Sequence, residues 1–550
     1  MANKLGRKTL PPGHSAGDFR YMGRPAMDQS DFGPDVGIAD CACVNQFGQA
    51  NNSKYYHGGV VQSTKTSGWY CYFEWGRIFS GKSWNGRFAG QDFQFVECDS
   101  EAEARSEFAK QMHSKNTKRG QWTTVAGVKV WAAKPGEDGY IVQSLATREK
   151  GLPDAYTIKD STGVTPNVAA PASSAPARKT VKSAKTFHPE VIRLAQSLVG
   201  GTRTYTRALS AAAGVTPTMD AIKRVRDDLI PAALERIKAV GNDVSRQVRD
   251  SDLVAVSKMV SAIVPRPIPR TGITAEEAVL NSNNITRLEQ DLDAFEAALR
   301  GEDFPVGTAT VDMDPDSTLN ARLRYIDPNS DEGRWLISAF SSMTNNRHGY
   351  IRGGVRMRSM FAVERPDRDA RFMAEVKRVA ALRQGRFALR ANLQPKRIDL
   401  GSDADLYAQA NVIFAIHGTR PVNIHPIMST NFRLPKSLPG ALITGANFGH
   451  GIYWATDWKK SYGYTGRGYY GAGGGSDISG RGCFMFLSDM LMGDAYRAPS
   501  TGSWNTPPDG KDSVFGVGGD RGHRLENDEH VIFSPDHQRI RYLVEFDWLT

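Results

Sequence analysis

The spacing of hydrophobic and polar positions changes from one part of the chain to the next. Between Tyr55 and about Tyr140, aromatic and β-branched residues gather in runs of strand length, such as GWYCYFEWGRIF and DFQFVE. Among these runs, the stretch EAEARSEFAKQM, which begins at Glu101, carries apolar residues at helical spacing instead. The pattern predicts a small antiparallel sheet accompanied by one helix.

From Phe187 to about Arg300 the apolar spacing becomes helical. The clearest stripe lies along one face of a single helix and comprises Ile285, Leu288, Leu292, Phe295 and Leu299. Pro231 interrupts another stripe, so we expect it to kink or divide that helix. Because a helix with one apolar stripe must pack against others, an all-helical bundle is expected here. From about Thr308 strand patterns return and glycine becomes frequent.

Shifts in composition indicate where the domains begin and end. Residues 1–45 are rich in Gly, Pro, Asp and Met without periodicity, which predicts a flexible N-terminal tail. Residues 151–186 are rich in Pro, Ala, Ser and Lys, which predicts a flexible linker. The expected folded parts are therefore residues 46–150, 187–305 and 306–550.

Composition is that of a soluble globular protein. The 550 residues are too many for one core, and 40% hydrophobic and 23% charged residues are ordinary proportions. No run approaches the roughly 18 apolar residues that span a bilayer, and the N-terminus lacks the apolar segment of a secretory signal. We expect an intracellular protein without a membrane partner, nuclear if its source is eukaryotic. The net charge of +10 favours a polyanionic partner without identifying it.

The cysteines give no indication of a metal site. There are 5 of them, and none forms the C-x-x-C pair that zinc ribbons and fingers use. Cys41 and Cys43 form a C-x-C, which we interpret as a loop pair, with a metal or redox role as the alternative. The sequence therefore predicts reduced thiols and no metal.

The candidate chemistry lies in three separated motifs near the C-terminal end. A strand-like run, NVIFAI, is followed by His417, and the glycine turn FGHGIYWATDWKKSYGY begins at Phe448. Much later, NDEHVIF places Glu529 at the start of another strand. Each motif alone is weak, but together and in this order they resemble the catalytic domain of the poly(ADP-ribose) polymerases.

This resemblance implies an NAD⁺-consuming ADP-ribosyltransferase in which His417, Tyr453 and Glu529 form the catalytic triad. Glu529 would hydrogen-bond a ribose hydroxyl and stabilise the positive charge that develops on the ribose, as in glycoside hydrolysis. A glutamate at this position is typical of the chain-elongating members of the family. NAD⁺ is the expected substrate, and no metal is required. The residues that the resemblance places against NAD⁺ are Gly418, Thr419, Arg433, Gly449, Ser461 and Tyr464. Of these, the backbone of Gly418 and the hydroxyl of Ser461 would bind the carboxamide, and Arg433 would lie on the adenosine side.

Two further segments resemble other domains of the same family. Glu74-Trp75-Gly76-Arg77 and the later FAKQMHSKNTKRGQW are similar to the WGR domain, although Ile78 and Phe79 replace the usual Val-Gly. The resemblance implies that DNA ends or nicks contact Trp75, Arg77, Lys82 and Lys118. The helical segment is similar to the regulatory domain that limits NAD⁺ access until DNA binds. Acceptor proteins, including the chain itself, are the other expected partners.

The fold class that follows is multidomain α+β. It comprises a WGR-like antiparallel sheet with a helix, an all-α helical bundle, and an α+β ADP-ribosyltransferase domain with antiparallel sheets. Two other functions stay open: a DNA-independent mono-ADP-ribosyltransferase effector, and a catalytically silent scaffold that binds DNA ends. A phosphate-loop pattern at Gly76–Ser83 is set aside, because the residues after Ser83 contain two glycines and no helical stripe.

Overall fold

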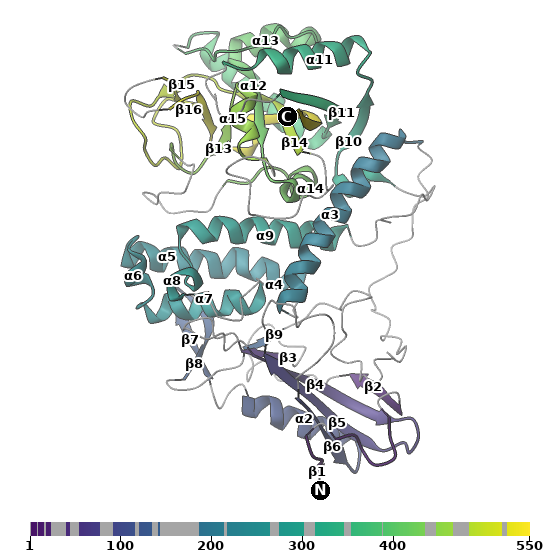
Figure 1. Cartoon of the computed structure of the whole chain (residues 1–550). Helices are drawn as coiled ribbons and strands as arrows, with labels where there is room; N and C mark the ends of the chain where they lie inside the picture. Colours follow the sequence, from purple (N-terminus) through teal and green to yellow (C-terminus); the bar gives the residue numbers. More distant parts are fainter. Residues whose placement is uncertain are drawn as a thin grey trace. The chain divides into compact units, whose positions relative to one another are not determined.

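The structure is a computed structural model of the chain, which forms two compact units (Figure 1). The first unit comprises Met1–Arg178 and Arg207–Asn281, and the second comprises Lys179–Thr206 and Ser282–Thr550. The residues that the structure describes are 2–7, 9–15, 18–23, 40–43, 54–77, 92–115, 120–134, 141–143, 186–213, 217–264, 274–301, 314–345, 354–387, 389–434, 447–465, 483–519 and 525–549.

An antiparallel sheet with one helix against it forms part of the first unit, as the strand-length runs predict. Its strand order is β1-β6-β5-β4-β3-β9, with β2 pairing with β4. Helix α2 packs on this sheet through Ala104, Phe108 and Met112. A separate hairpin joins β7 to β8. The bounds are β1 Asn3–Lys4, β2 Phe19–Gly23, β3 Asp40–Cys43, β4 Lys54–Ser63, β5 Trp69–Arg77, β6 Asp92–Cys98, α2 Glu101–Lys115, β7 Gly120–Val125, β8 Val128–Ala133 and β9 Ile141–Gln143.

The segment predicted as a flexible tail differs from that expectation. It supplies three strands of the sheet: β1 pairs with β6, β2 pairs with β4, and β3 pairs with both β4 and β9. Phe19 is buried, and its ring lies 4.8 Å from that of Phe95. Strands this short have too few alternating positions to produce a period in the sequence, so only pairing with longer neighbours orders them. The predicted linker falls almost entirely outside the described residues.

The predicted helical segment is divided between the two units. A π-helical turn, Val225–Leu229, lies between α4 and α5, which begins one residue before Pro231. The backbone stays right-handed helical at Arg224, Leu229 and Ile230, so the helix continues through this turn. Proline has no N–H to donate to the preceding turn, and a wider turn accommodates this loss. Helix α3 spans the boundary between the units. The helices here are α3 Pro189–Ala213, α4 Met219–Arg224, α5 Ile230–Val240, α6 Val244–Gln247, α7 Ser251–Ile263, α8 Ala275–Ala278 and α9 Ser282–Arg300.

Two sheets form the second unit, which confirms the mixed α+β class with antiparallel sheets. The larger has the order β10-β11-β18-β14-β12 and is antiparallel throughout. The smaller has the order β13-β17-β16-β15, in which β15 and β16 are parallel. The strands are β10 Arg322–Ile326, β11 Gly354–Glu364, β12 Val412–Gly418, β13 Ile452–Trp454, β14 Cys483–Leu491, β15 Ala495–Arg497, β16 Ser513–Gly516, β17 Glu529–Ile532 and β18 Gln538–Leu549.

Helices of varied length accompany these sheets in the second unit. They are α10 Pro315–Leu319, α11 Asp331–Ser342, α12 Pro366–Arg383, η3 Gly401–Asp403, α13 Ala404–Ala410, α14 Pro421–Ser429, α15 Trp458–Tyr462 and η4 Pro535–His537. Among the residues with assigned structure, no helix is long and apolar enough to cross a membrane.

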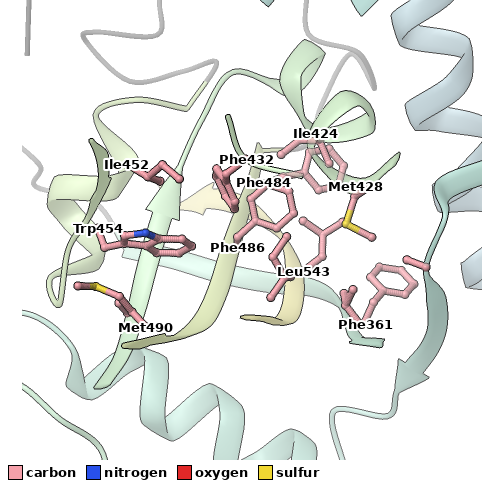
Figure 2. Close-up of a cluster of buried hydrophobic side chains, with 14 of the residues drawn as sticks. Phe361, Ile424, Met428, Phe432, Ile452, Trp454, Phe484, Phe486, Met490 and Leu543 are labelled. Carbon is pink, nitrogen blue, oxygen red and sulfur yellow. The ribbon is translucent and has the colours of Figure 1, made fainter. Parts of the chain in front are cut away.

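The core of the second unit is built around the interior strand β14, in which every residue is buried. Figure 2 shows part of it, where Phe484 and Phe486 of β14 meet Phe432, Trp454 and Leu543 from other segments. Asp489, near the end of β14, has no exposed surface and accepts hydrogen bonds from Arg397 and Tyr407, both at 2.8 Å. A buried carboxylate is tolerated here because charged and polar donors surround it.

Candidate active site

Strand pairing brings the three candidate catalytic residues to one region of the second unit. His417 lies near the end of β12, and a bridge between Ile416 and Ala455 holds β12 beside β13, which contains Tyr453. Strand β13 pairs with β17, whose first residue is Glu529. The chain therefore folds three remote motifs into adjoining strands.

The His417 ring is fixed in one tautomer. Its Nδ1 lies 2.8 Å from the carbonyl oxygen of Tyr453. Since a carbonyl only accepts hydrogen bonds, Nδ1 carries the proton and Nε2 presents a lone pair. Burial lowers the pKa of His417 to about 4, so the ring is neutral at pH 7. The rings of Phe432 and Trp454 pack against it at 4.8 and 5.3 Å between centroids.

The Tyr453 hydroxyl closes the glycine turn that precedes it. It donates to the carbonyl oxygen of Gly449 at 2.8 Å and accepts from the backbone N–H of Phe448 at 2.9 Å. Burial, with the nearby charge of Glu529 adding to it, raises the pKa of Tyr453. Gly449 has a φ of +89°, and a Cβ there would lie 2.1 Å from the carbonyl oxygen of Trp504, so glycine is required.

The Glu529 carboxylate is buried, with 5% of its surface exposed, and its two oxygens differ. Oε1 forms an ion pair with Lys460 Nζ and accepts from Asn447 Nδ2 at 3.5 Å. Oε2 is buried and has no hydrogen-bond donor within the described part of the chain. An acceptor of this kind is costly to bury unless a donor reaches it, which is what a substrate hydroxyl can supply.

Lys460 and Asn447 were missed by the sequence-based prediction. The motif contains adjacent lysines, and only the fold shows that Lys460 of α15 turns toward Glu529 while Lys459 lies over the Trp458 ring. Asn447 precedes the glycine turn without any pattern that distinguishes it.

The residues predicted around the carboxamide of NAD⁺ are tightly packed together. A Cβ on Gly418 would lie 1.8 Å from the carbonyl oxygen of Ser461, so the backbone of α15 itself requires glycine there. The Ser461 hydroxyl donates to the carbonyl oxygen of Ile416 at 3.1 Å, and its donation to the carboxamide stays a prediction. Thr419 is buried and accepts from Asn423 at 2.9 Å. Tyr464 lies close enough to Tyr453 to contribute to its raised pKa.

Arg433, predicted to lie on the adenosine side, is engaged by helix α9. Its Nη1 lies 3.2 Å from Asp293 and its Nη2 lies 3.0 Å from Glu296. Glu296 is itself buried and accepts from Arg300 at 2.6 Å. Helix α9 also packs against α14, which follows β12. In this structure, two carboxylates of α9 therefore hold the guanidinium predicted to meet the substrate.

The predicted DNA contacts are only partly described. Trp75 lies in β5, partly buried against the sheet core, with the Arg7 guanidinium 5.7 Å from its ring. Arg77 ends the same strand, and its side chain lies outside the described residues, as do Lys82, Lys118 and the second half of the phosphate-loop pattern. Within the described ranges, no three His, Cys, Asp or Glu side chains are grouped to hold a metal ion.

Residues 337–548 match the family described as the poly(ADP-ribose) polymerase catalytic domain. Over these residues the chain is therefore similar to the poly(ADP-ribose) polymerase catalytic domain. The matched region includes every residue assigned above to the triad and to NAD⁺. One curated relative, poly [ADP-ribose] polymerase 1 of Oryza sativa subsp. japonica, is 33% identical over 108 residues. That alignment covers 20% of this chain and spans a tenth of the relative's length. The WGR-like and helical segments lie outside the family match.

Burial of histidines makes the second unit sensitive to acid. Burial lowers the pKa of His425 to about 4, and burial also lowers that of His530. Below about pH 6.5 the unfolded chain therefore binds protons that the folded chain does not, and stability falls until about pH 4. His425 alone contributes about 3 kcal/mol of this loss.

We expect the free energy of unfolding, measured with urea from pH 7.5 to 4.5, to decrease steadily below pH 6.5. His530→Phe should flatten this slope, because phenylalanine preserves the stacking on Phe515 without a titrating group. An identical slope in the wild type and in His530→Phe would contradict the conclusion that His530 takes up a proton on unfolding.

Proposed function

We propose that the chain is an NAD⁺ ADP-ribosyltransferase that extends poly(ADP-ribose) on acceptor proteins, including itself, and that DNA ends or nicks stimulate it. The observation that carries this proposal is the Glu529 carboxylate, which Lys460 holds by one oxygen while the other is buried without a donor in the described residues. Glu529 lies in the region that matches the poly(ADP-ribose) polymerase catalytic domain, and close to Tyr453. This position supports a substrate hydroxyl as the hydrogen-bond partner of that oxygen.

The residues of the site fit a ribose bound to nicotinamide. His417 Nε2 and Glu529 Oε2 are both acceptors, which suits two ribose hydroxyls. Tyr453 and Tyr464 offer aromatic faces to the nicotinamide ring. Because the hydroxyl of Ser461 already donates to Ile416, we assign carboxamide recognition to the backbone of Gly418 in this domain.

NAD⁺ supplies the ADP-ribosyl group, with nicotinamide as the leaving group. In the transfer the bond between C1′ and the nicotinamide nitrogen breaks, and nicotinamide leaves with the electron pair. The acceptor oxygen forms a new bond to C1′ and loses its proton. Glu529 stabilises the positive charge that develops on the ribose, and the low exposure of its carboxylate strengthens that interaction.

Control by DNA is proposed to act through helix α9. The ion pairs of Arg433 with Asp293 and Glu296 hold an NAD⁺-side residue against this helix. Loosening of α9 on DNA binding would release Arg433 toward the substrate. The proposed DNA contact is the WGR-like segment, with Trp75, Arg77, Lys82 and Lys118. Contacts of its basic residues with phosphates would bind DNA without sequence preference.

To test this function, the purified protein is incubated with labelled NAD⁺, with and without nicked or blunt DNA, and nicotinamide release and polymer length are measured. We expect nicotinamide release and long polymers that increase on addition of DNA. No release under either condition would contradict the transferase, and a salt-sensitive DNA complex without turnover would indicate the silent scaffold. Activity that is insensitive to DNA and stops at single ADP-ribose units would favour the mono-transferase.

A further inference from the structure

The ion pair between Lys460 and Glu529 joins two elements that are far apart in sequence, α15 and β17. Attraction between two charges favours many geometries, whereas catalysis requires one. The surroundings of the pair therefore determine where each group lies. A single short segment, Met343 to Asn345, makes hydrogen bonds to the start of α15 and to the loop that precedes β17.

The first set of contacts fixes the start of α15. Asp457 is 2% exposed, and its Oδ1 accepts from the backbone N–H groups of Lys459 and Lys460 at 2.8 and 3.4 Å, which caps the helix. Its Oδ2 accepts from the backbone N–H of Asn345 at 2.8 Å. The Trp458 N–H donates to the carbonyl oxygen of Met343 at 2.9 Å.

The second contact fixes the loop that leads into β17. Asn345 Nδ2 donates to Asn527 Oδ1, and Asn527 is 3% exposed and stands two residues before Glu529. The next residue, Asp528, accepts from the backbone N–H of Gly518 at 2.7 Å. The backbone of Asn345 thus holds the helix that carries Lys460, while its side chain holds the loop that carries Glu529.

We propose that Asn345 is a positioning residue that sets the separation and orientation of Lys460 and Glu529 during transfer. It acts through Asp457 on one side and Asn527 on the other, without touching the substrate. Because the segment is tied to both elements, a displacement of either one moves the other. The inference rests on the ADP-ribosyl transfer proposed above.

The test compares Asn345→Ala with Asn345→Asp in the full chain. Alanine keeps the backbone N–H that Asp457 needs and removes the side-chain hydrogen bond to Asn527. Aspartate restores that contact, since the Asn527 amide can rotate and donate to it. We expect Asn345→Ala to lower kcat for nicotinamide release about tenfold or more with KM for NAD⁺ nearly unchanged, and Asn345→Asp to recover much of the loss.

Gln538→Ala is the matched control. It also removes a buried amide in the same domain, one that donates to Asn431 at 2.8 Å and lies outside the Lys460–Glu529 region. Thermal unfolding is measured on all variants, and Gln538→Ala should lose stability while retaining kcat.

Three outcomes would overturn the inference: a wild-type kcat in Asn345→Ala, equal losses of kcat in Asn345→Ala and Gln538→Ala, or no recovery with aspartate. If Asn345→Ala does not fold, Asn345→Ser, whose hydroxyl is too short to reach Asn527, is judged by the same criteria. A wild-type chain that releases no nicotinamide ends both proposals, whereas an active wild type with an unaffected Asn345→Ala ends only this one.

Discussion

Replacing Glu529 with glutamine is expected to lower polymer elongation at least a hundredfold while leaving slow NAD⁺ cleavage. Oε2 of the carboxylate is a buried acceptor, and an amide placed there with its oxygen toward Lys460 presents an N–H to the ribose hydroxyl instead. The substitution also removes the negative charge that stabilises the developing positive charge in the transition state. Loss of one such electrostatic group typically costs 10²–10³ in kcat.

The measurement is polymer length and nicotinamide release from labelled NAD⁺ under single-turnover and steady-state conditions. Asp528→Asn is the control, because it makes the same change one residue away. An asparagine there can still accept from the Gly518 N–H at its Oδ1 and pair with Asn392. We expect this control to keep wild-type polymer length. Polymers of unchanged length from Glu529→Gln would contradict the role assigned to the carboxylate.

Some parts of the catalytic region could be predicted because their signals are local. The run NVIFAI indicates strand β12, and the stripe from Ile285 to Leu299 indicates α9; both elements are present at these positions. The start of β17 at Glu529 also agrees with the sequence. The sequence alone indicates each of these elements, because its apolar residues have the spacing that the backbone geometry of a strand or helix requires.

Other parts depend on contacts that no local pattern records. Lys459 and Lys460 are chemically identical neighbours, and the direction in which α15 leaves its Asp457 cap decides which one meets Glu529. The hydrogen bond of the Ser461 hydroxyl to the Ile416 carbonyl also depends on tertiary packing, because the bridge between Ile416 and Ala455 brings these segments together. Such outcomes arise from tertiary packing and become visible only in the structure.

The N-terminal strands could not be predicted from composition. Residues 1–45 have the composition of a tail, yet β2 pairs with β4 over Phe19–Gly23 and buries Phe19. The partner strand β4 has 10 residues, twice the length of β2. Composition alone therefore underestimates order wherever a short segment adds to an existing sheet.

Neutralising the acidic residues of α9 that hold Arg433 is expected to raise activity in the absence of DNA. The Asp293→Asn/Glu296→Gln double variant keeps the shape of both side chains but removes the two charges 3.2 and 3.0 Å from the guanidinium. Arg433 is about one-third exposed, so we discount the pairs for solvent screening and assign them about 1–2 kcal/mol together. A shift of that size corresponds to about a five- to thirtyfold change in the population with Arg433 released.

The readout is the rate of nicotinamide release without DNA and its ratio to the rate with DNA. We expect the DNA-free rate to rise about five- to thirtyfold. The stimulation by DNA should decrease by the same factor, since the substitutions and DNA binding both shift the equilibrium toward released Arg433. Glu332→Gln is the control, because it removes a carboxylate that pairs with Arg324 at 2.8 Å on the surface of the same unit and should leave both rates unchanged. Arg433→Ala is unsuitable, because it removes the ion pairs and the predicted substrate contact together. A double variant whose DNA-free rate equals that of the wild type would show that these ion pairs do not restrain the enzyme.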